Sequence, residues 1–238
     1  MTLEEFFEKI EFEAKQLLQC NDIWYRGHSS CSYQLTPTIN RGSIKNEIAL
    51  FYDYKTYAAA INGEHKGDWE LLLDMQHYGL PTRLLDWTTS LGTALYFALK
   101  GSPESPCIWL LDPYELSYQS TGSEVVYDTT QFDSSSITYN ESFDVSKIIV
   151  RESGLGKPFS IQPPHSNRRI AAQRGRFTVH GNSRAPIEEQ CPNVVKKVAI
   201  PSNLVQQLQK YLALLGIDDY SQLPDHEGLS AFLKGKYA

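Results

Sequence analysis

Long apolar runs are missing from this chain of 238 residues. No window approaches the roughly 18 uninterrupted apolar residues that a membrane-spanning helix needs, so no membrane partner is expected. The chain begins with the acidic residues Glu4 and Glu5 instead of the basic and apolar pattern of a signal peptide. A protein without that pattern is expected to be cytoplasmic.

Cysteine and positive charge are both scarce. The cysteines are widely separated and form no C-x-x-C pair, which favours free thiols over a zinc site, so no metal is expected. The four are Cys20, Cys31, Cys107 and Cys191. The formal net charge is -6. This charge argues against broad electrostatic binding to a nucleic acid backbone, although it is compatible with a local basic pocket.

Several motifs that carry known chemistry are also absent. The chain contains no G-x-x-x-x-G-K phosphate loop, no G-x-G-x-x-G dinucleotide motif, no H-E-x-x-H zinc motif and no G-x-S-x-G nucleophile motif. Kinase, dehydrogenase, zinc protease and serine hydrolase functions therefore have no support from motifs.

Apolar residues make up 41% of the chain, enough for a core, and their spacing predicts one α+β domain. Helices are expected over about residues 2–19 and 46–62, on each side of residues 76–88, after Pro201 and after Pro224. Strands are expected at residues 23–26, 107–111, 176–180 and 194–200. Residues 115–146 are rich in Ser, Thr and Tyr and weakly periodic, which predicts a long loop with little regular structure.

Residues 76–88 hold the densest functional chemistry, with the sequence QHYGLPTRLLDWT. Gly79 can end the preceding helix and Pro81 cannot continue it, so a polar turn or short strand is expected between two helices. The imidazole, guanidinium, carboxylate and hydroxyl groups in this segment exceed what a connection between helices needs. A binding site is therefore predicted here.

Structural roles stay open for the same side chains. His77 can be a base or a hydrogen-bond donor, or it can only interact with the dipole at its helix end. Arg83 and Asp86 can form an ion pair with each other, and Trp87 can belong to the core. The density of polar and aromatic groups in so short a segment favours function over packing.

A second candidate segment is Trp24-Tyr25-Arg26-Gly27-His28. The guanidinium of Arg26 stands at the end of a predicted strand, where it can meet a phosphate or carboxylate through two hydrogen bonds. Gly27 removes side-chain bulk beside it. A surface ion pair of Arg26 is the alternative interpretation.

A third candidate segment, residues 168–180, holds four arginines and no acid inside an acidic chain. This composition favours an anionic ligand. A solvated basic face is the alternative, above all for Arg174 and Arg176. The amide of Gln173 can orient a polar ligand but is a poor base.

Together the three segments resemble the FRG domain family, named for a Phe/Tyr-Arg-Gly motif that stands here as Tyr25-Arg26-Gly27. The resemblance covers roughly residues 22–181. It continues in order through residues 35–41, 76–88, 94–98 and 173–180. On this basis we expect an FRG domain over residues 1–201 and a helical cap of the same domain over residues 202–238.

The order of motifs is more distantly similar to that of ADP-ribosyltransferases. This resemblance implies a split central β-sheet flanked by helices, NAD as the substrate, and Arg26 on the NAD phosphates. Thr88 or Thr89 would support the nicotinamide side. Gln173 would take the third position, where these enzymes usually have Glu. The ligand-binding set implied is Arg26, Gly27, His28, Tyr78, Thr82, Arg83, Thr88, Thr89 and Arg169.

The amide of Gln173 cannot act as the missing carboxylate, so His77 and Asp86 join it as candidate catalytic residues. The resemblance implies an enzyme that transfers ADP-ribose to an unknown acceptor, a protein or nucleic acid among the candidates, or that hydrolyses NAD. The alternative is a non-catalytic module that binds a nucleotide or a partner, and a nuclease or nucleic-acid binder ranks third. In each nucleotide-binding case the three segments are predicted to converge on one cleft.

Overall fold

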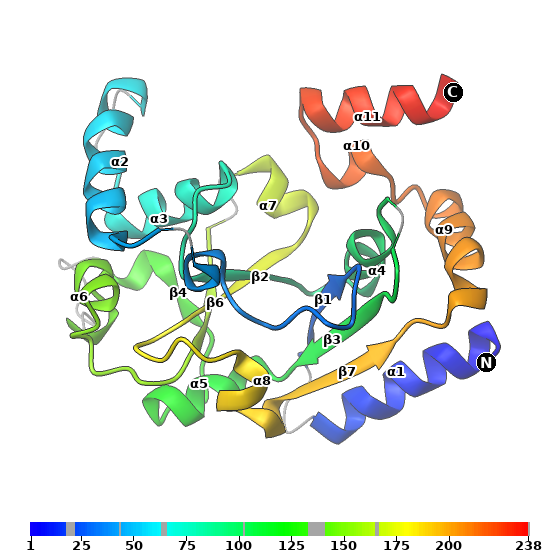
Figure 1. Ribbon diagram of the computed structural model, residues 1–238, viewed down its shortest axis with the longest axis horizontal. Helices are drawn as coiled ribbons and strands as arrows, with labels where there is room; N and C mark the ends of the chain where they lie inside the picture. Colours follow the sequence, from blue (N-terminus) through cyan, green and yellow to red (C-terminus); the bar gives the residue numbers. More distant parts are fainter. Residues whose placement is uncertain are drawn as a thin grey trace.

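The computed structural model describes residues 1–17, 22–42, 44–62, 66–101, 103–132, 141–164 and 167–237. Within these residues a seven-stranded sheet with the order β4-β5-β6-β2-β1-β3-β7 is flanked by helices (Figure 1). The strands are β1 Trp24–His28, β2 Leu84–Thr88, β3 Cys107–Leu111, β4 Tyr127–Asp128, β5 Phe159–Gln162, β6 Gly175–Val179 and β7 Val195–Ala199. The predicted α+β class is confirmed.

The first group of helices along the chain is α1 Leu3–Leu17, α2 Glu47–Asn62, α3 Asp68–His77, α4 Leu91–Leu99 and α5 Pro113–Thr121. The second is α6 Val145–Val150, α7 Arg168–Ala172, α8 Ile187–Gln190, α9 Val205–Leu214, α10 Asp219–Gln222 and α11 His226–Tyr237. In the view of Figure 1, α2, α3 and α6 lie on the left of the sheet, α1, α9 and α11 on the right, and α4, α5 and α8 between them. No helix in the described part of the chain is long and apolar enough to cross a membrane.

The sheet is continuous, but its connection between β1 and β2 is short. β1 pairs antiparallel with β3 along five residues, and β2 pairs antiparallel with β6 along five residues. Between β1 and β2 the register consists of Tyr25 opposite Thr88. The two halves of the sheet are therefore held together at one point, and beside this point they leave room for side chains from both.

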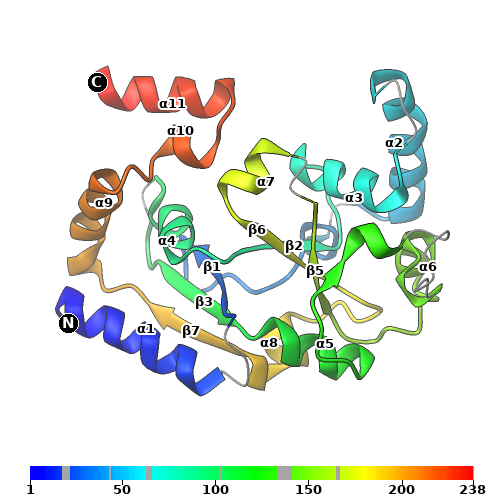
Figure 2. The same ribbon diagram turned by 180° about the vertical axis from the view of Figure 1, so that it is seen from behind.

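Alternating side chains place three apolar clusters on the two faces of the sheet. Along β3, Ile108 and Leu110 join the cluster of α1, α4 and α9, whereas Trp109 and Leu111 join the cluster of α5 and α8. A third cluster packs α2, α3 and α6 against β5 and β6. Leu116 of α5 and Ile187 of α8 are buried in the same cluster, below the sheet in the view of Figure 1 and of Figure 2.

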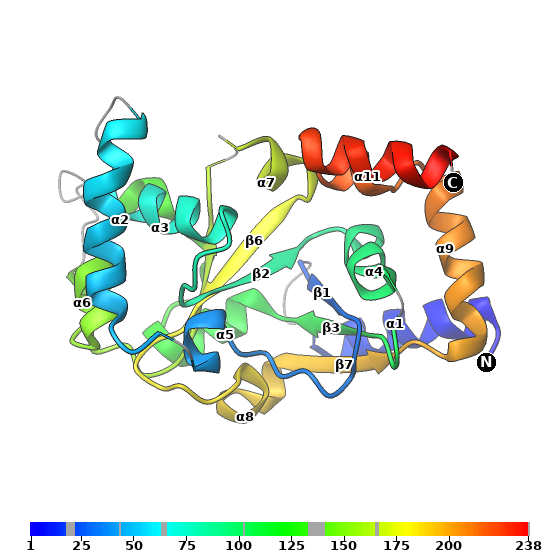
Figure 3. The same cartoon turned by 45° about the horizontal axis from the view of Figure 1, so that its top comes forward.

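The C-terminal helices pack against the rest of the molecule through specific contacts. Leu208 of α9 lies in the same cluster as α1 and α4. The hydroxyl of Tyr96 on α4 donates to Asp219 of α10 at 2.6 Å, and Lys100 pairs with the same carboxylate at 3.0 Å. Figure 3 shows α9 beside α4, with α11 beginning on the side of α7 and ending above α9. Arg169 of α7 pairs with Asp225 at 3.3 Å, which places the C-terminal segment next to α7.

The prediction of a long loop over residues 115–146 is wrong for part of the segment. Helix α5 occupies Pro113–Thr121, because Asp112 accepts hydrogen bonds from the backbone of Tyr114 and Glu115 at 3.0 Å and Pro113 stands at the first helical position. The short strand β4 also falls in this segment, and α6 begins at its end. Residues 133–140 lie outside the described residues, as do residues 18 and 19 of the predicted first helix.

Candidate functional site

A cavity of about 450 Å³ opens where β1 and β2 diverge. Its volume lies within the range of small-molecule sites in proteins. Side chains of all three candidate segments line it, so the predicted convergence is confirmed. The lining residues are Tyr25, Arg26, Gly27, His28, Ser29, Tyr33, Leu73, Gln76, His77, Asp86, Trp87, Thr88, Thr93, Ala94, Phe97, Arg169, Ile170, Gln173, Phe177 and Leu223.

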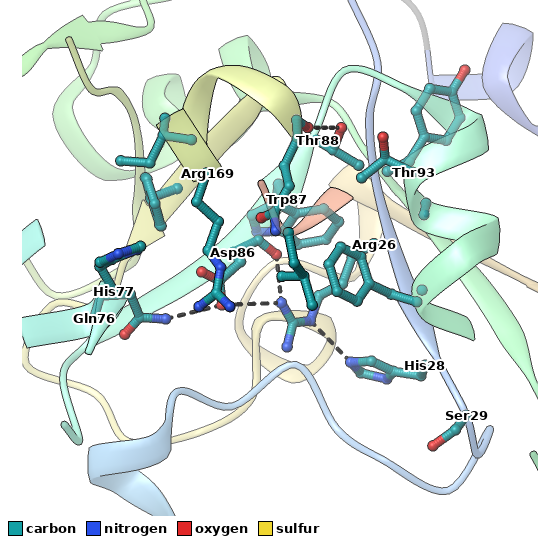
Figure 4. Close-up of a pocket in the computed structure, with 18 of the residues that line it drawn as sticks. Arg26, His28, Ser29, Gln76, His77, Asp86, Trp87, Thr88, Thr93 and Arg169 are labelled. Atoms are coloured by element: carbon teal, nitrogen blue, oxygen red, sulfur yellow. Dashed lines mark hydrogen bonds and ion pairs between the residues drawn. The ribbon is translucent and has the colours of Figure 1, made fainter. Parts of the chain in front are cut away.

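The guanidinium of Arg26 lies at the centre of the polar contacts in Figure 4. Its Nε donates to His28 Nε2 at 3.0 Å, and its Nη1 donates to the backbone oxygen of Asp86 at 2.6 Å. The Asp86 carboxylate is 3.5 Å from the same Nη1. Side-chain exposure is 19% for Arg26 and 55% for Asp86, so solvent weakens this ion pair. A ligand anion can therefore compete with Asp86 for the guanidinium.

Asp86 is held by a chain of side chains that leads back to Thr82. The hydroxyl of Thr82 donates to Gln76 Oε1 at 2.5 Å, and Gln76 Nε2 donates to the Asp86 carboxylate at 2.9 Å. Thr82 itself is buried and does not line the cavity. Its contribution is to fix the amide of Gln76, which then positions the carboxylate.

His28 lies between two N–H groups that can only donate hydrogen bonds. Its Nε2 faces Arg26 and its Nδ1 faces the indole nitrogen of Trp109 at 3.2 Å. A neutral imidazole has one lone pair, so it can accept from only one of these donors at a time. Burial, together with the charge of Arg26, lowers the pKa of His28 to about 3. The ring is therefore neutral at physiological pH and cannot serve as a cationic ligand for phosphate.

Gln173 is positioned by the end of α7. Its backbone oxygen accepts from the hydroxyl of Thr88 at 2.7 Å, which ties α7 to β2. Its side-chain Nε2 donates to the backbone oxygen of Gln222 at 2.9 Å. The next residue, Arg174, has a φ of 48°, an uncommon left-handed conformation for a non-glycine residue, and it turns the chain from α7 into β6. Thr88 therefore supports the site through Gln173.

Arg169 and His77 form the side of the cavity opposite Arg26. Figure 4 shows Arg169 reaching from α7 toward the space beside Asp86. Its Nη2 lies 3.3 Å from Asp225 and 3.6 Å from Glu227, both in the C-terminal segment. Burial and the charge of Arg169 lower the pKa of His77. A neutral His77 can accept a proton or a hydrogen bond from a ligand.

Gly27 has a different role from the one that the sequence suggested. A Cβ at this position would lie 1.9 Å from the backbone oxygen of Ala94 and 2.6 Å from the nitrogen of Ala98. Both atoms belong to α4, so the glycine allows this helix to approach β1 and does not chiefly make room for a ligand. The close approach brings Thr93 and Phe97 of α4 to the cavity.

Besides Thr82, three of the predicted ligand-binding residues lie outside the cavity lining. Tyr78 is 72% exposed and its ring contacts His77. The backbone N–H of Thr89 donates a hydrogen bond to the backbone oxygen of Arg174 at 3.4 Å. Arg83 is 2% exposed and binds both oxygens of Glu47, at 2.6 and 2.7 Å. The guanidinium of Arg83 also donates to backbone oxygens of residues 149 and 181, so its donors serve the fold.

The sequence interpretation missed several contributors to the cavity. Tyr25, Tyr33, Phe97 and Phe177 add aromatic rings, and Leu223 comes from the C-terminal segment. Tyr25, Phe97 and Phe177 stand inside the motifs quoted above, so their position was a usable signal. No local pattern indicates that Leu223 reaches the cavity, because that contact depends on how the C-terminal helices fold back.

The cavity combines local positive charge with aromatic walls. Two guanidiniums and one carboxylate line it, a formal charge of +1 within a chain of net charge -6. Aromatic rings and guanidiniums together suit a planar ligand with an anionic group. Among the described residues, no group of three or more His, Cys, Asp or Glu side chains is placed to hold a metal ion.

Comparison with known proteins identifies one family. Residues 21–106 match the family model of the FRG domain, so this part of the chain is an FRG domain. The match includes Arg26, His77 and Asp86 but ends before Arg169 and Gln173. No curated protein and no solved structure matched the chain.

Proposed function

We propose that this FRG-domain chain binds NAD in the cavity between β1 and β2 and acts on it as an ADP-ribosyltransferase-like enzyme. The observation that carries the proposal is the convergence of Arg26 and Arg169 with aromatic rings in one cavity of about 450 Å³. Guanidiniums bind phosphate oxygens through paired hydrogen bonds, and rings stack on a nicotinamide or adenine base. NAD offers both kinds of group in one molecule.

The reaction breaks the bond between ribose C1′ and the nicotinamide nitrogen. The electron pair of that bond leaves with nicotinamide, and an acceptor oxygen or nitrogen forms the new bond to C1′. The acceptor loses its proton to a base, for which Asp86 is the carboxylate in the cavity. With water as the acceptor the same steps hydrolyse NAD to ADP-ribose and nicotinamide.

The residues divide this work between binding and orientation. Arg26 binds the diphosphate, and the ligand replaces the Asp86 contact on its guanidinium. Asp86 then stays in place through Gln76, 2.9 Å away, and is free to take the proton. Gln173, tied to Thr88, orients the ribose through its amide, since an amide is a hydrogen-bonding group and a poor base.

A second candidate function is a nucleotide-binding module without catalysis. It is favoured by the amide at Gln173 and by the contacts that Asp86 makes with Arg26 and Gln76. If these contacts persist with ligand bound, no carboxylate is available at the reacting carbon. Both candidates predict nucleotide binding, and they differ in whether nicotinamide is released.

Two measurements test the proposal and separate the candidates. At an NAD concentration of 100 times Kd, binding stabilises the fold by about 2.7 kcal/mol and raises Tm by roughly 5–11 °C for a chain of this size. Nicotinamide release, measured with and without candidate acceptors, reports catalysis. If NAD binds but no nicotinamide is released under any condition, the non-catalytic binding module is the candidate that remains. A Tm that does not respond to NAD, ADP-ribose or related nucleotides refutes both candidates.

Two substitutions assign the roles within the site. Arg26→Ala removes a charge-assisted contact worth about 1.5–3 kcal/mol, so nucleotide binding is expected to weaken tenfold or more. Gln173→Ala is expected to lower turnover more than affinity, because it orients the reacting groups. An equal loss of affinity in both variants, without any turnover in the wild type, would support the module.

A further inference from the structure

A second cavity of about 550 Å³ adjoins the first one. It lies between the beginning of α7 and the C-terminal segment of α10 and α11. Its lining residues are His77, Asn167, Arg168, Arg169, Tyr220, Pro224, Asp225, His226 and Leu229. Two of them, His77 and Arg169, also line the first cavity, so the two spaces share a wall made of side chains.

The shared wall can yield to a ligand because, within the described part of the chain, the ion pairs of Arg169 are with exposed acids. Its partners Asp225 and Glu227 have side-chain exposures of 42% and 82%, so water competes for both contacts. The Nε of Arg169 is buried and has no partner within the described residues. A phosphate between the cavities can engage the guanidinium, including this unused donor, in place of the two carboxylates.

Asp225 does not need Arg169 in order to stay in place. Its carboxylate accepts from the backbone nitrogen of Gly228 at 3.0 Å, which caps the beginning of α11. This hydrogen bond, with the charge of Arg169, lowers the pKa of Asp225. The C-terminal wall of the second cavity therefore keeps its shape when the guanidinium turns toward a ligand.

The C-terminal segment also contacts the first cavity. Leu223 lines it, and the backbone oxygen of Gln222 accepts from Gln173. In the second cavity, Arg168 adds a guanidinium and Tyr220 adds a half-exposed ring that packs near Phe232 of α11. A cation and an exposed ring that line the same cavity suit a nucleoside with a phosphate.

We propose that the second cavity is the subsite for the adenosine half of a dinucleotide, with Arg169 on the diphosphate between the two halves. This proposal rests on the proposed function and names residues 219–229 as part of the binding site. The nicotinamide half occupies the first cavity near Thr88 and Gln173, and the adenine ring stacks on Tyr220 with Arg168 beside it. The site is then bipartite and selects a dinucleotide over a mononucleotide.

Titration calorimetry with NAD and with nicotinamide mononucleotide tests the subsite. Arg168→Gln and Tyr220→Ala change only the second cavity, and each is expected to weaken NAD binding by about fivefold or more, as the loss of a stacked base or a phosphate contact does. Binding of nicotinamide mononucleotide is expected to stay within about twofold of wild type. The matched controls are Arg184→Gln and Tyr211→Ala, which remove an exposed guanidinium and an exposed ring outside both cavities, and both should bind NAD like the wild type.

The outcomes separate the subsite from the proposed function. If Arg168→Gln and Tyr220→Ala bind NAD as tightly as wild type, the subsite is refuted while NAD binding in the first cavity stands. If they weaken the binding of both ligands equally, Arg168 and Tyr220 support the fold and the second cavity is no subsite. If wild-type protein binds neither NAD nor nicotinamide mononucleotide, the proposed function fails and the subsite fails with it.

Discussion

Arg83 and Arg26 allow a sharp test of the site, because Arg83 is buried in an ion pair of the fold whereas Arg26 lines the cavity. Arg83 is 2% exposed and forms a two-pronged ion pair with Glu47, whose side chain is 15% exposed. The substitution Arg83→Gln leaves the carboxylate of Glu47 without its cation in a largely buried place. Removing one partner of a buried pair costs about 3–5 kcal/mol. For a chain of this size the expected fall in Tm is roughly 6–20 °C.

The matched variant is Arg26→Gln. Its ion pair with Asp86 is half-exposed, so the expected loss of stability is no more than about 1 kcal/mol. Urea and thermal unfolding at pH 7 measure both variants, and titration with NAD measures their affinity. Arg26→Gln should lose affinity and keep stability, whereas the folded fraction of Arg83→Gln should keep affinity and lose stability.

The opposite result would refute this reasoning. If Arg83→Gln unfolds like wild type and fails to bind nucleotide, Arg83 belongs to the binding site as its sequence context suggested. Should Arg83→Gln be too unstable to purify, Arg83→Lys keeps the charge and loses the paired geometry. A smaller loss of stability with unchanged affinity is then expected.

Three further predictions concern the fold around the site. Gly27→Ala pushes a methyl group into the backbone of α4 and should cost at least about 1–3 kcal/mol and weaken ligand binding, whereas Gly156→Ala, with open space around it, should be nearly neutral in urea unfolding. Burial lowers the pKa of His180 to about 3, below its ordinary value of 6.5, so the unfolded chain binds the proton first and stability falls as pH drops from about 6.5 toward 3. His180→Gln should reduce that slope by up to about 1.4 kcal/mol per pH unit in urea unfolding between pH 6 and 4. Asp112→Ala removes the cap of α5 and should cost about 0.5–2 kcal/mol by the same measurement.

Elements with strong local signals were predictable from the sequence. Pro106 and Pro113 bound a compact apolar run, and β3 occupies the predicted residues 107–111. Gly79 and Pro81 correctly marked the end of α3 and the passage into β2. Glycine readily adopts the left-handed conformation that ends a helix, and proline cannot continue one. The strand β5 and the helix α7 were not predicted, because both are short and their stability comes from pairing with β6 and from contacts with the C-terminal segment.

Ion pairing in the site could not be predicted because it depends on how distant strands meet. The sequence made Arg83 and Asp86 candidates for a pair with each other, but they pair with Glu47 and with Arg26 respectively. In an extended chain, residues three apart point to opposite faces, whereas in a helix they would be neighbours. The strand geometry of β2 therefore separates Arg83 from Asp86, and the partners come from 36 and 60 residues away in sequence.

The same geometry explains why the site lies where it does. The register between β1 and β2 consists of Tyr25 opposite Thr88, so the two halves of the sheet diverge beside that point. The side chain of Arg26 lies in the space that this divergence leaves open. Gly27 lets α4 close one wall, and α7 closes another by bonding Gln173 to Thr88. Both guanidiniums of the cavity are then balanced by acids that remain partly in water, so an anionic ligand displaces weak contacts and gains buried ones. A sheet fully paired between β1 and β2 would have filled this space with backbone hydrogen bonds and left no cavity for the arginines to share.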